Sequence, residues 1–137
     1  MAGYLLETNV VSETRKVRAE PGVMAFVRAA DAARLFISVL SLGELRKGVA
    51  ARRRTDPIAA ERLGIWVDGI ETIFADRILP VDATVARIWG ELSAGRSRPV
   101  VDTLLAATAV ASGLTLVTRN TRDVTATGVA LVDQWQA

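Results

Sequence analysis

Four side chains with carboxylate or amide oxygens lie at widely separated positions of this sequence: Glu7, Glu44, Asp102 and Asn120. Oxygen donors of this kind favour hard cations such as Mg²⁺ or Mn²⁺ over zinc or copper. Carboxylates that share one cleft also repel one another, and a bound cation offsets that repulsion. These side chains therefore predict a cation site, if the fold brings them together.

The strands that would position these side chains are apolar runs over residues 4–6, 35–39 and 114–117, a composition typical of parallel strands buried on both faces. Glu7 directly follows the first run, and Asn120 lies just past the third. Glu44 opens the helix expected after the second run, and Asp102 lies in the first turn of the helix that leads into the third. Because ligands bind at the carboxyl ends of the strands in such sheets, we expect one shared cleft.

The rest of the chain alternates helical and strand patterns. Helices are expected from a Thr8 or Asn9 cap to about residue 15, from 21 to about 30, in a hairpin after 41 and 56, and around 85–92 and 100–112. Short strands are expected over residues 77–81 and 129–132. The pattern predicts an α/β fold, a three-layer α/β/α domain with a mostly parallel central sheet.

Composition restricts the chemistry. The chain has 137 residues, of which half are apolar, and this predicts a single domain over residues 1–137. The absence of cysteine and histidine excludes disulfides, thiolate zinc sites, cysteine nucleophiles and imidazole bases. The first residues lack the pattern of a secretory signal, and no apolar run reaches membrane-spanning length, so we expect a cytoplasmic protein with no membrane association.

The net charge is only +2, but the positive charge is clustered at residues 15–18, 46–47, 52–54 and 96–98. These clusters could face the phosphates of a nucleic acid. Alternatively, residues 52–54 end a helix, where cations offset the negative end of the helix dipole, and the other clusters are solvated surface. An acidic pocket beside basic surface favours the nucleic-acid interpretation.

The acidic residues also have structural interpretations. Ser41 and Glu44 match a capping box, in which Glu44 would bond back to the amide of Ser41 and have no catalytic role. Asp102 near a helix start is favoured by the helix dipole. Its helix, however, continues with an almost uniformly apolar stretch, so a charge there is costly unless a cation or partner compensates it. Asn120 or Asp123 could simply shape a turn.

Four segments together resemble a known family. They cover residues 3–13, 40–48, 101–109 and 116–120. In this order and spacing they resemble PIN-domain ribonucleases, specifically the VapC toxins of VapBC toxin–antitoxin pairs. The resemblance implies a cytoplasmic endoribonuclease that depends on magnesium or manganese, forms a homodimer and is inhibited by a cognate VapB-like antitoxin. It also implies a larger toxin–antitoxin assembly that represses its own operon through the antitoxin.

The resemblance and the residues together predict metal-assisted hydrolysis of RNA phosphodiester bonds, with Glu7, Glu44, Asp102 and Asn120 as the catalytic set. Glu7, Asp102 and Glu44 would hold one or two cations, and a water activated there would attack phosphorus in line, leaving a 5′ phosphate and a 3′ hydroxyl. Supporting roles fall to side chains that orient ligands or waters, Thr8, Asn9, Thr118 and Asp123. RNA phosphate contacts are expected from Arg46 and Arg119.

One position departs from the family pattern. Members almost always carry aspartate where this chain has Glu7, whose side chain is longer by one methylene, or about 1.5 Å. Magnesium requires ligands at about 2.0–2.1 Å in nearly octahedral geometry, so Glu7 either adjusts the site or weakens it. The alternative function is therefore a catalytically silent protein that engages an antitoxin or nucleic acid. A metal-dependent phosphatase for small substrates is a further alternative, which would not need the arginine clusters.

Overall fold

The computed structural model describes residues 3–119, 121–124 and 127–135. Its strands are β1 Tyr4–Leu6, β2 Leu35–Ser38, β3 Ile78–Leu79, β4 Thr115–Val117 and β5 Leu131–Val132. Its helices are α1 Thr8–Glu13, α2 Pro21–Ala29, α3 Val39–Arg53, α4 Pro57–Ile73, α5 Ala83–Ser93, α6 Val100–Ser112 and α7 Thr121–Val124, with a 3₁₀ turn, η1, at Ala32–Arg34.

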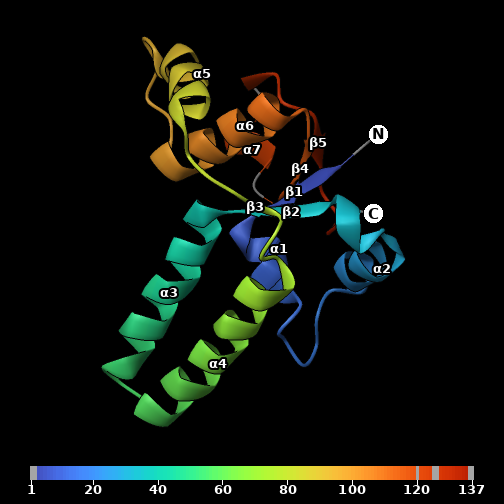
Figure 1. Cartoon of the computed structure of the whole chain (residues 1–137), viewed down its shortest axis with the longest axis vertical. Coiled ribbons are helices and arrows are strands. Elements are labelled where there is room, and N and C mark those ends of the chain that lie inside the picture. Colours follow the sequence, from blue (N-terminus) through green and yellow to red (C-terminus); the bar gives the residue numbers. More distant parts are fainter. Residues whose placement is uncertain (1–2, 120, 125–126, 136–137) are drawn as a thin grey trace.

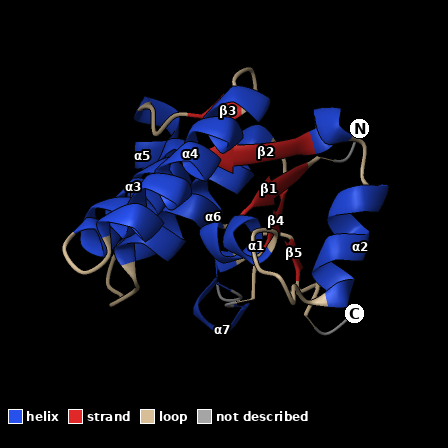
Figure 2. Cartoon of the chain, turned by 90° about the horizontal axis from the view of Figure 1, so that it is seen from below, coloured by secondary structure: helices blue, strands red, loops and turns tan. Residues whose placement is uncertain are grey.

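The sheet has the order β3-β2-β1-β4-β5, and every pairing in it is parallel. β1 lies at the centre, with Leu5 opposite Phe36 of β2 and Leu116 of β4. Because all strands run the same way, their carboxyl ends meet at one edge of the sheet. Figure 2 shows the arrow of β2 pointing toward the side on which α3 begins.

Helices cover both faces of the sheet, which confirms the predicted three layers (Figure 1). Successive side chains of a strand point to opposite faces. Leu5 accordingly packs with Leu105 and Ala109 of α6, whereas Leu6 belongs to the apolar cluster formed with α1, α2, α3 and α4. α5 packs against α6, and α3 and α4 form the expected helical hairpin.

Most predicted elements are confirmed, but the start of α3 is not where the sequence suggested. β2 ends at Ser38, and α3 begins at Val39, because the Ser38 side chain accepts a hydrogen bond from the amide of Leu40 at 3.0 Å. Ser41 is therefore a fully buried residue inside the helix, and the capping-box interpretation of Ser41 and Glu44 is wrong. Glu44 lies in the second turn rather than at the helix start.

The cap of α1 also differs from the prediction. The helix begins at Thr8, and the residue in the N-cap position is Glu7, with no hydrogen bond from its side chain to the helix. The predicted capping role of Thr8 or Asn9 is therefore wrong, and both side chains are available for other contacts. The predicted end of α6 is confirmed, since Gly113 adopts the left-handed conformation with φ of 65°.

None of the helices in the described ranges is long and apolar enough to cross a membrane.

Candidate active site

The backbone of Glu7 joins β1 to α1 and is fixed from both sides. Its amide donates to the carbonyl of Val117 in β4 at 3.0 Å, and its carbonyl accepts from the amide of Val10 at 3.0 Å. Its side chain is directed by Thr118, whose hydroxyl donates to Glu7 Oε2 at 2.6 Å. Glu7 is 9% exposed and Thr118 2% exposed, so this bond holds a buried carboxylate at the carboxyl edge of the sheet.

Burial raises the pKa of the Glu7 carboxyl above its ordinary value. Hydrogen bonds from Thr118 and from the Asn9 side chain act in the opposite direction, while the charges of Asp102 and Glu44 raise the pKa further. The structure therefore brings the three predicted carboxylates into one electrostatic environment. They come from the end of β1, from α3 and from the first turn of α6.

Glu44 is connected to α1 through Thr8. The hydroxyl of Thr8 donates to Glu44 Oε1 at 2.5 Å and lies 2.9 Å from Ser41 Oγ, with which it is also hydrogen-bonded. Ser41 precedes Glu44 by three residues, so both side chains lie on the same face of α3. Thr8 thus orients the carboxylate of Glu44, and the hydrogen bond between Thr8 and the buried Ser41 side chain holds Thr8 in place.

Asp102 lies in the first turn of α6 as predicted, and it is half-buried. The Asn9 side chain is hydrogen-bonded to Glu7, and its Oδ1 is buried where no donor in the described part of the chain reaches it. Asn120 lies outside the described residues, as does the side chain of Asp123, whose backbone belongs to α7. Those two predicted positions stay predictions.

An open cleft of about 390 Å³ lies beside Glu7, and Asp102 is not among the residues that line it. Its acidic part contains Glu7 and Glu44, together with Thr8 and Asn9 of α1. Its rim is basic, and the side chains there are Lys16, Arg119 and, beside them, Glu13 and Trp135. An acidic floor beneath a cationic rim suits a polyanion that is cleaved through a bound cation.

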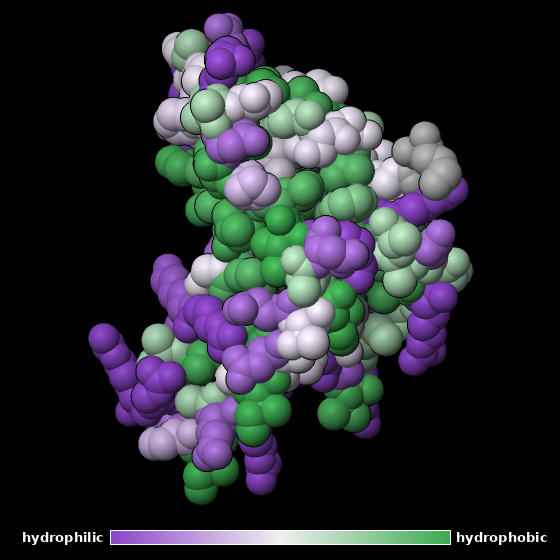
Figure 3. Space-filling view, in the orientation of Figure 1, coloured by the Kyte–Doolittle hydropathy of each residue, from purple (hydrophilic) through white to green (hydrophobic). Residues whose placement is uncertain are grey.

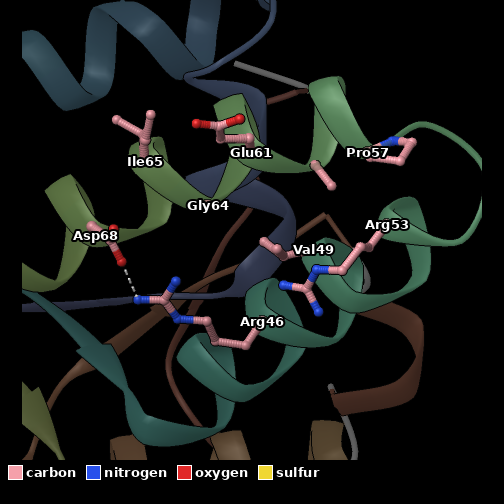
Figure 4. Close-up of a pocket in the computed structure, with 9 residues that line it drawn as sticks. Arg46, Val49, Arg53, Pro57, Glu61, Gly64, Ile65 and Asp68 are labelled. Carbon is pink, nitrogen blue, oxygen red and sulfur yellow. Dashed lines mark hydrogen bonds and ion pairs between the residues drawn. The ribbon is translucent and has the colours of Figure 1, made fainter.

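The predicted phosphate contact of Arg46 is not supported by the structure. Its guanidinium binds Asp68 at 2.6 Å and Glu71 at 3.0 Å on α4, and the first of these contacts is the larger cause of its raised pKa. The reason is helix geometry, because a residue two positions after Glu44 projects from nearly the opposite side of α3. Figure 4 shows Arg46 there, beside a separate hollow of about 460 Å³ between α3 and α4.

The donor set fits a hard cation, because it consists of carboxylate, amide and hydroxyl oxygens. The unpartnered Oδ1 of Asn9 adds a buried acceptor that a hydrated cation would satisfy. Within the described ranges, however, no three acidic side chains are already close enough to form a complete metal-binding group. A cation at this edge would thus draw the side chains of Glu7, Glu44 and Asp102 together.

Comparison with known proteins places this arrangement in a family. The family profile described as PIN domain matches residues 4–127. The chain belongs to the PIN-domain family. It is 32% identical to VapC ribonuclease Y4jK of Sinorhizobium fredii, with 96% of this chain and 97% of that protein covered. It is 33% identical to Toxin FitB of Neisseria gonorrhoeae, with 96% and 97% covered.

Solved structures give the same result for the PIN domain. The crystal structure of FitAcB from Neisseria gonorrhoeae matches with a TM-score of 0.83 and 32% identity, over 98% of this chain and 99% of that one. The DNA-bound VapBC from Salmonella typhimurium matches with a TM-score of 0.77 at 23% identity, over 98% and 99%. The latter likeness shows the fold.

Three residues that line or support the PIN-domain cleft were not singled out from the sequence. Ser41 was considered only as a helix cap, although its spacing of three from Glu44 could have suggested a shared helix face. Glu13 has the same spacing from Lys16. Trp135 packs partly against the apolar core and also lines the cleft, and no local sequence pattern indicates that it reaches the cleft.

Proposed function

We propose that residues 1–137 form a single PIN domain and that the protein is the toxin of a type II toxin–antitoxin pair. In this proposal it is an endoribonuclease that hydrolyses RNA phosphodiester bonds with the help of Mg²⁺ or Mn²⁺. The observation that carries the proposal is the buried carboxylate of Glu7, whose pKa is raised by burial and, beyond that, by Asp102 and Glu44. Like charges gathered at the ligand edge of a parallel sheet repel one another, and a bound cation would offset that repulsion.

Glu7, Asp102 and Glu44 would hold the cation, and Asn120 would complete the set. A bound divalent cation supplies positive charge that offsets the charge developing at phosphorus and lowers the pKa of water. Thr118 and Asn9 fix the carboxylate of Glu7, and Thr8 fixes that of Glu44. Arg119 at the rim would bind the RNA backbone.

The proposed partners are a VapB-like antitoxin, RNA and a second copy of this chain. FitAB and VapBC structures, by their descriptions, are complexes of which some hold DNA, and the same kind of assembly is proposed here. Apolar atoms gather between the α5–α6 pair and the α3–α4 pair on the face seen in Figure 3. Exposed Val39, Val81 and Val100 belong to segments at this part of the molecule, which we assign to the homodimer contact.

The experiment that tests the proposed function is cleavage of single-stranded RNA with added Mg²⁺, added Mn²⁺ or excess chelator. Asp102→Asn removes a charge from the cluster and should abolish cleavage. Asp76→Asn is the matched control, because the carboxylate of Asp76 is 85% exposed and lies away from the cleft. Full activity in chelator, or unchanged cleavage by Asp102→Asn, would refute the metal mechanism.

A second candidate function is binding without cleavage. It is favoured by Glu7 itself, whose longer side chain is held against Thr118, and by the lack of a preformed metal-binding group among the described side chains. This candidate predicts that the protein binds an antitoxin with the affinity typical of such pairs but cleaves no RNA with either metal. Mapped RNA ends that depend on Asp102 would exclude it.

A further inference from the structure

Two cations at the rim of the cleft are held in place by residues that the proposed chemistry does not use. Lys16, in the turn after α1, lies with its Nζ 2.8 Å from Glu13 Oε1. Arg119, directly after Thr118, lies with its guanidinium carbon 5.5 Å from the ring centroid of Trp135. The two cations come from segments far apart in the sequence, line the same cleft, and each contacts one neighbouring side chain that holds it.

Glu13 is the support on the α1 side. Its side chain is only 7% exposed, and its second oxygen, Oε2, accepts a hydrogen bond from the amide of Glu20 at 2.9 Å. The contact with Lys16 and then that with the Glu20 amide hold the pKa of Glu13 below its ordinary value. Glu13 thus links α1, the following turn and the start of α2, and it keeps Lys16 at the rim.

Trp135 is the support on the other side, and it is fixed by the packing of the C-terminal segment. The Trp135 ring packs against the apolar cluster that the sheet forms with α1 to α4. The backbone amide of Trp135 donates a hydrogen bond to Asp133 Oδ1 at 2.9 Å. The preceding residue, Gln134, lies so close to Gly22 that a Cβ at Gly22 would overlap the carbonyl oxygen of Gln134. The glycine therefore allows the segment to approach α2 and carry Trp135 to the cleft.

Both cations are available to an anion. The side chain of Lys16 is 61% exposed despite its contact with Glu13. Within the described ranges, no carboxylate lies at ion-pair distance from Arg119, in contrast to Arg46, which two acidic residues occupy. A buried carboxylate and an aromatic ring that each orient one exposed cation form a built site rather than a random basic surface.

We propose that Lys16 and Arg119 together bind the RNA backbone phosphate next to the one that is cleaved, and that Glu13 and Trp135 are positioning residues that hold them for it. The inference rests on the proposed function, which places the cleaved phosphate over the carboxylates of Glu7, Glu44 and Asp102. That phosphate needs a cation between itself and Glu7. The neighbouring phosphate falls outside the acidic floor, where the rim supplies the positive charge directly.

The first test measures the binding of a short, fluorescein-labelled single-stranded RNA by anisotropy, in excess chelator so that no cleavage occurs. The dependence of log K on log[KCl] should become less steep by about 0.7 for Lys16→Gln and again for Arg119→Gln. Arg87→Gln is the matched control, because Arg87 is an exposed arginine of α5 on the other face of the sheet, and its slope should equal that of the wild type.

The second test separates positioning from simple electrostatics. Glu13→Gln makes the protein more positive by one charge, so electrostatics alone predicts tighter RNA binding, whereas positioning predicts binding weakened roughly fivefold to tenfold. Trp135→Leu leaves the charge unchanged and should weaken binding, while Trp135→Phe keeps a ring and should restore most of it. Thermal melts of all variants report whether they fold.

The third test identifies the phosphate. Replacing one backbone phosphate at a time by a neutral methylphosphonate should reveal one position, beside the cleaved bond, at which the substitution and Arg119→Gln are not additive in KM. Additivity at every position, wild-type slopes for Lys16→Gln and Arg119→Gln, or variants that lose only antitoxin inhibition would each overturn the subsite. Salt-dependent binding that both variants lose, in a protein that never cleaves RNA, would support the subsite and refute the nuclease.

Discussion

The hydrogen bond from Thr118 to Glu7 gives a prediction whose magnitude follows from the structure. Thr118→Val keeps the shape of a side chain that is 2% exposed and removes a bond of 2.6 Å to a carboxylate that is 9% exposed. A hydrogen bond to a charged group contributes about 1.5–3 kcal/mol, which corresponds to a melting temperature lower by roughly 5–12 °C for a domain of this size.

The pH dependence identifies the cause. The bond lowers the pKa of Glu7, so its removal raises that pKa further. The loss of stability should therefore be largest above the folded pKa of Glu7, where the carboxylate is charged, and should shrink toward about 1 kcal/mol below that pKa, where Glu7 is protonated.

Thr108→Val is the control for Thr118→Val. The hydroxyl of Thr108 is also buried, at 1% exposed, but it donates to the neutral carbonyl of Leu104 at 2.7 Å within α6. Its loss should be about 0.5–1.5 kcal/mol at any pH. Urea denaturation of both variants in chelator, at neutral and acid pH, measures the contrast. Equal losses for the two variants at both pH values would show that the Thr118 bond has no charge-assisted character, and the reasoning would be wrong.

Three further predictions concern Glu7 and the dimer. Burial, together with Asp102 and Glu44, raises the folded pKa of Glu7, so in chelator the stability should fall as the pH rises from the unfolded pKa through the folded pKa. Glu7→Gln should remove that fall from a plot of melting temperature against pH. A plot that is the same for the variant and the wild type would contradict the prediction. Glu7→Asp should raise Mg²⁺-dependent cleavage yet lower the melting temperature, because the aspartate carboxylate ends about 1.5 Å short of Thr118. If the folded variant cleaves RNA no faster than the wild type with either Mg²⁺ or Mn²⁺, the site accommodates glutamate. Val81→Asp changes a valine that is 38% exposed and should convert the homodimer to a monomer, as measured by light scattering. RNA cleavage per folded chain is measured in parallel. An unchanged mass would show that the face around Val81 is not part of the homodimer contact.

Sequence reasoning located the strands well because burial on both faces leaves little room for polar residues in them. The same continuity hid the end of β2, where the apolar run passes from Ile37 through Val39 and Leu40 into α3 without a break. Ser38 and Ser41 are both capable caps, and only the hydrogen bond to the Leu40 amide identifies Ser38. Local sequence does not decide between two caps three residues apart.

The candidate site was predictable where it depends on the parallel sheet, and not where it depends on distant packing. The apolar runs predict that the strands end at one edge of the sheet, and the pairing of β1 with β4, which the sequence does not specify, brings Glu7 to Thr118 across a sequence separation of 111 residues. The direction of Arg46 follows from helix geometry and could have been foreseen. The approach of Gln134 to Gly22 could not, because no periodic pattern connects a C-terminal segment to a helix start.

Stability and catalysis are opposed at Glu7. Without a cation, burial and the charges of Asp102 and Glu44 all disfavour the ionised carboxylate, and hydrogen bonds from Thr118 and Asn9 recover part of that cost. The extra methylene of glutamate brings the carboxylate within 2.6 Å of the Thr118 hydroxyl, and that bond stabilises this position of the side chain. We expect a bound cation instead to draw the carboxylates toward one another, away from such hydroxyl contacts. If Glu7 holds a cation as proposed, breaking the Thr118 bond would cost part of the cation's binding free energy, so we expect the strength of that bond to set how tightly a cation binds.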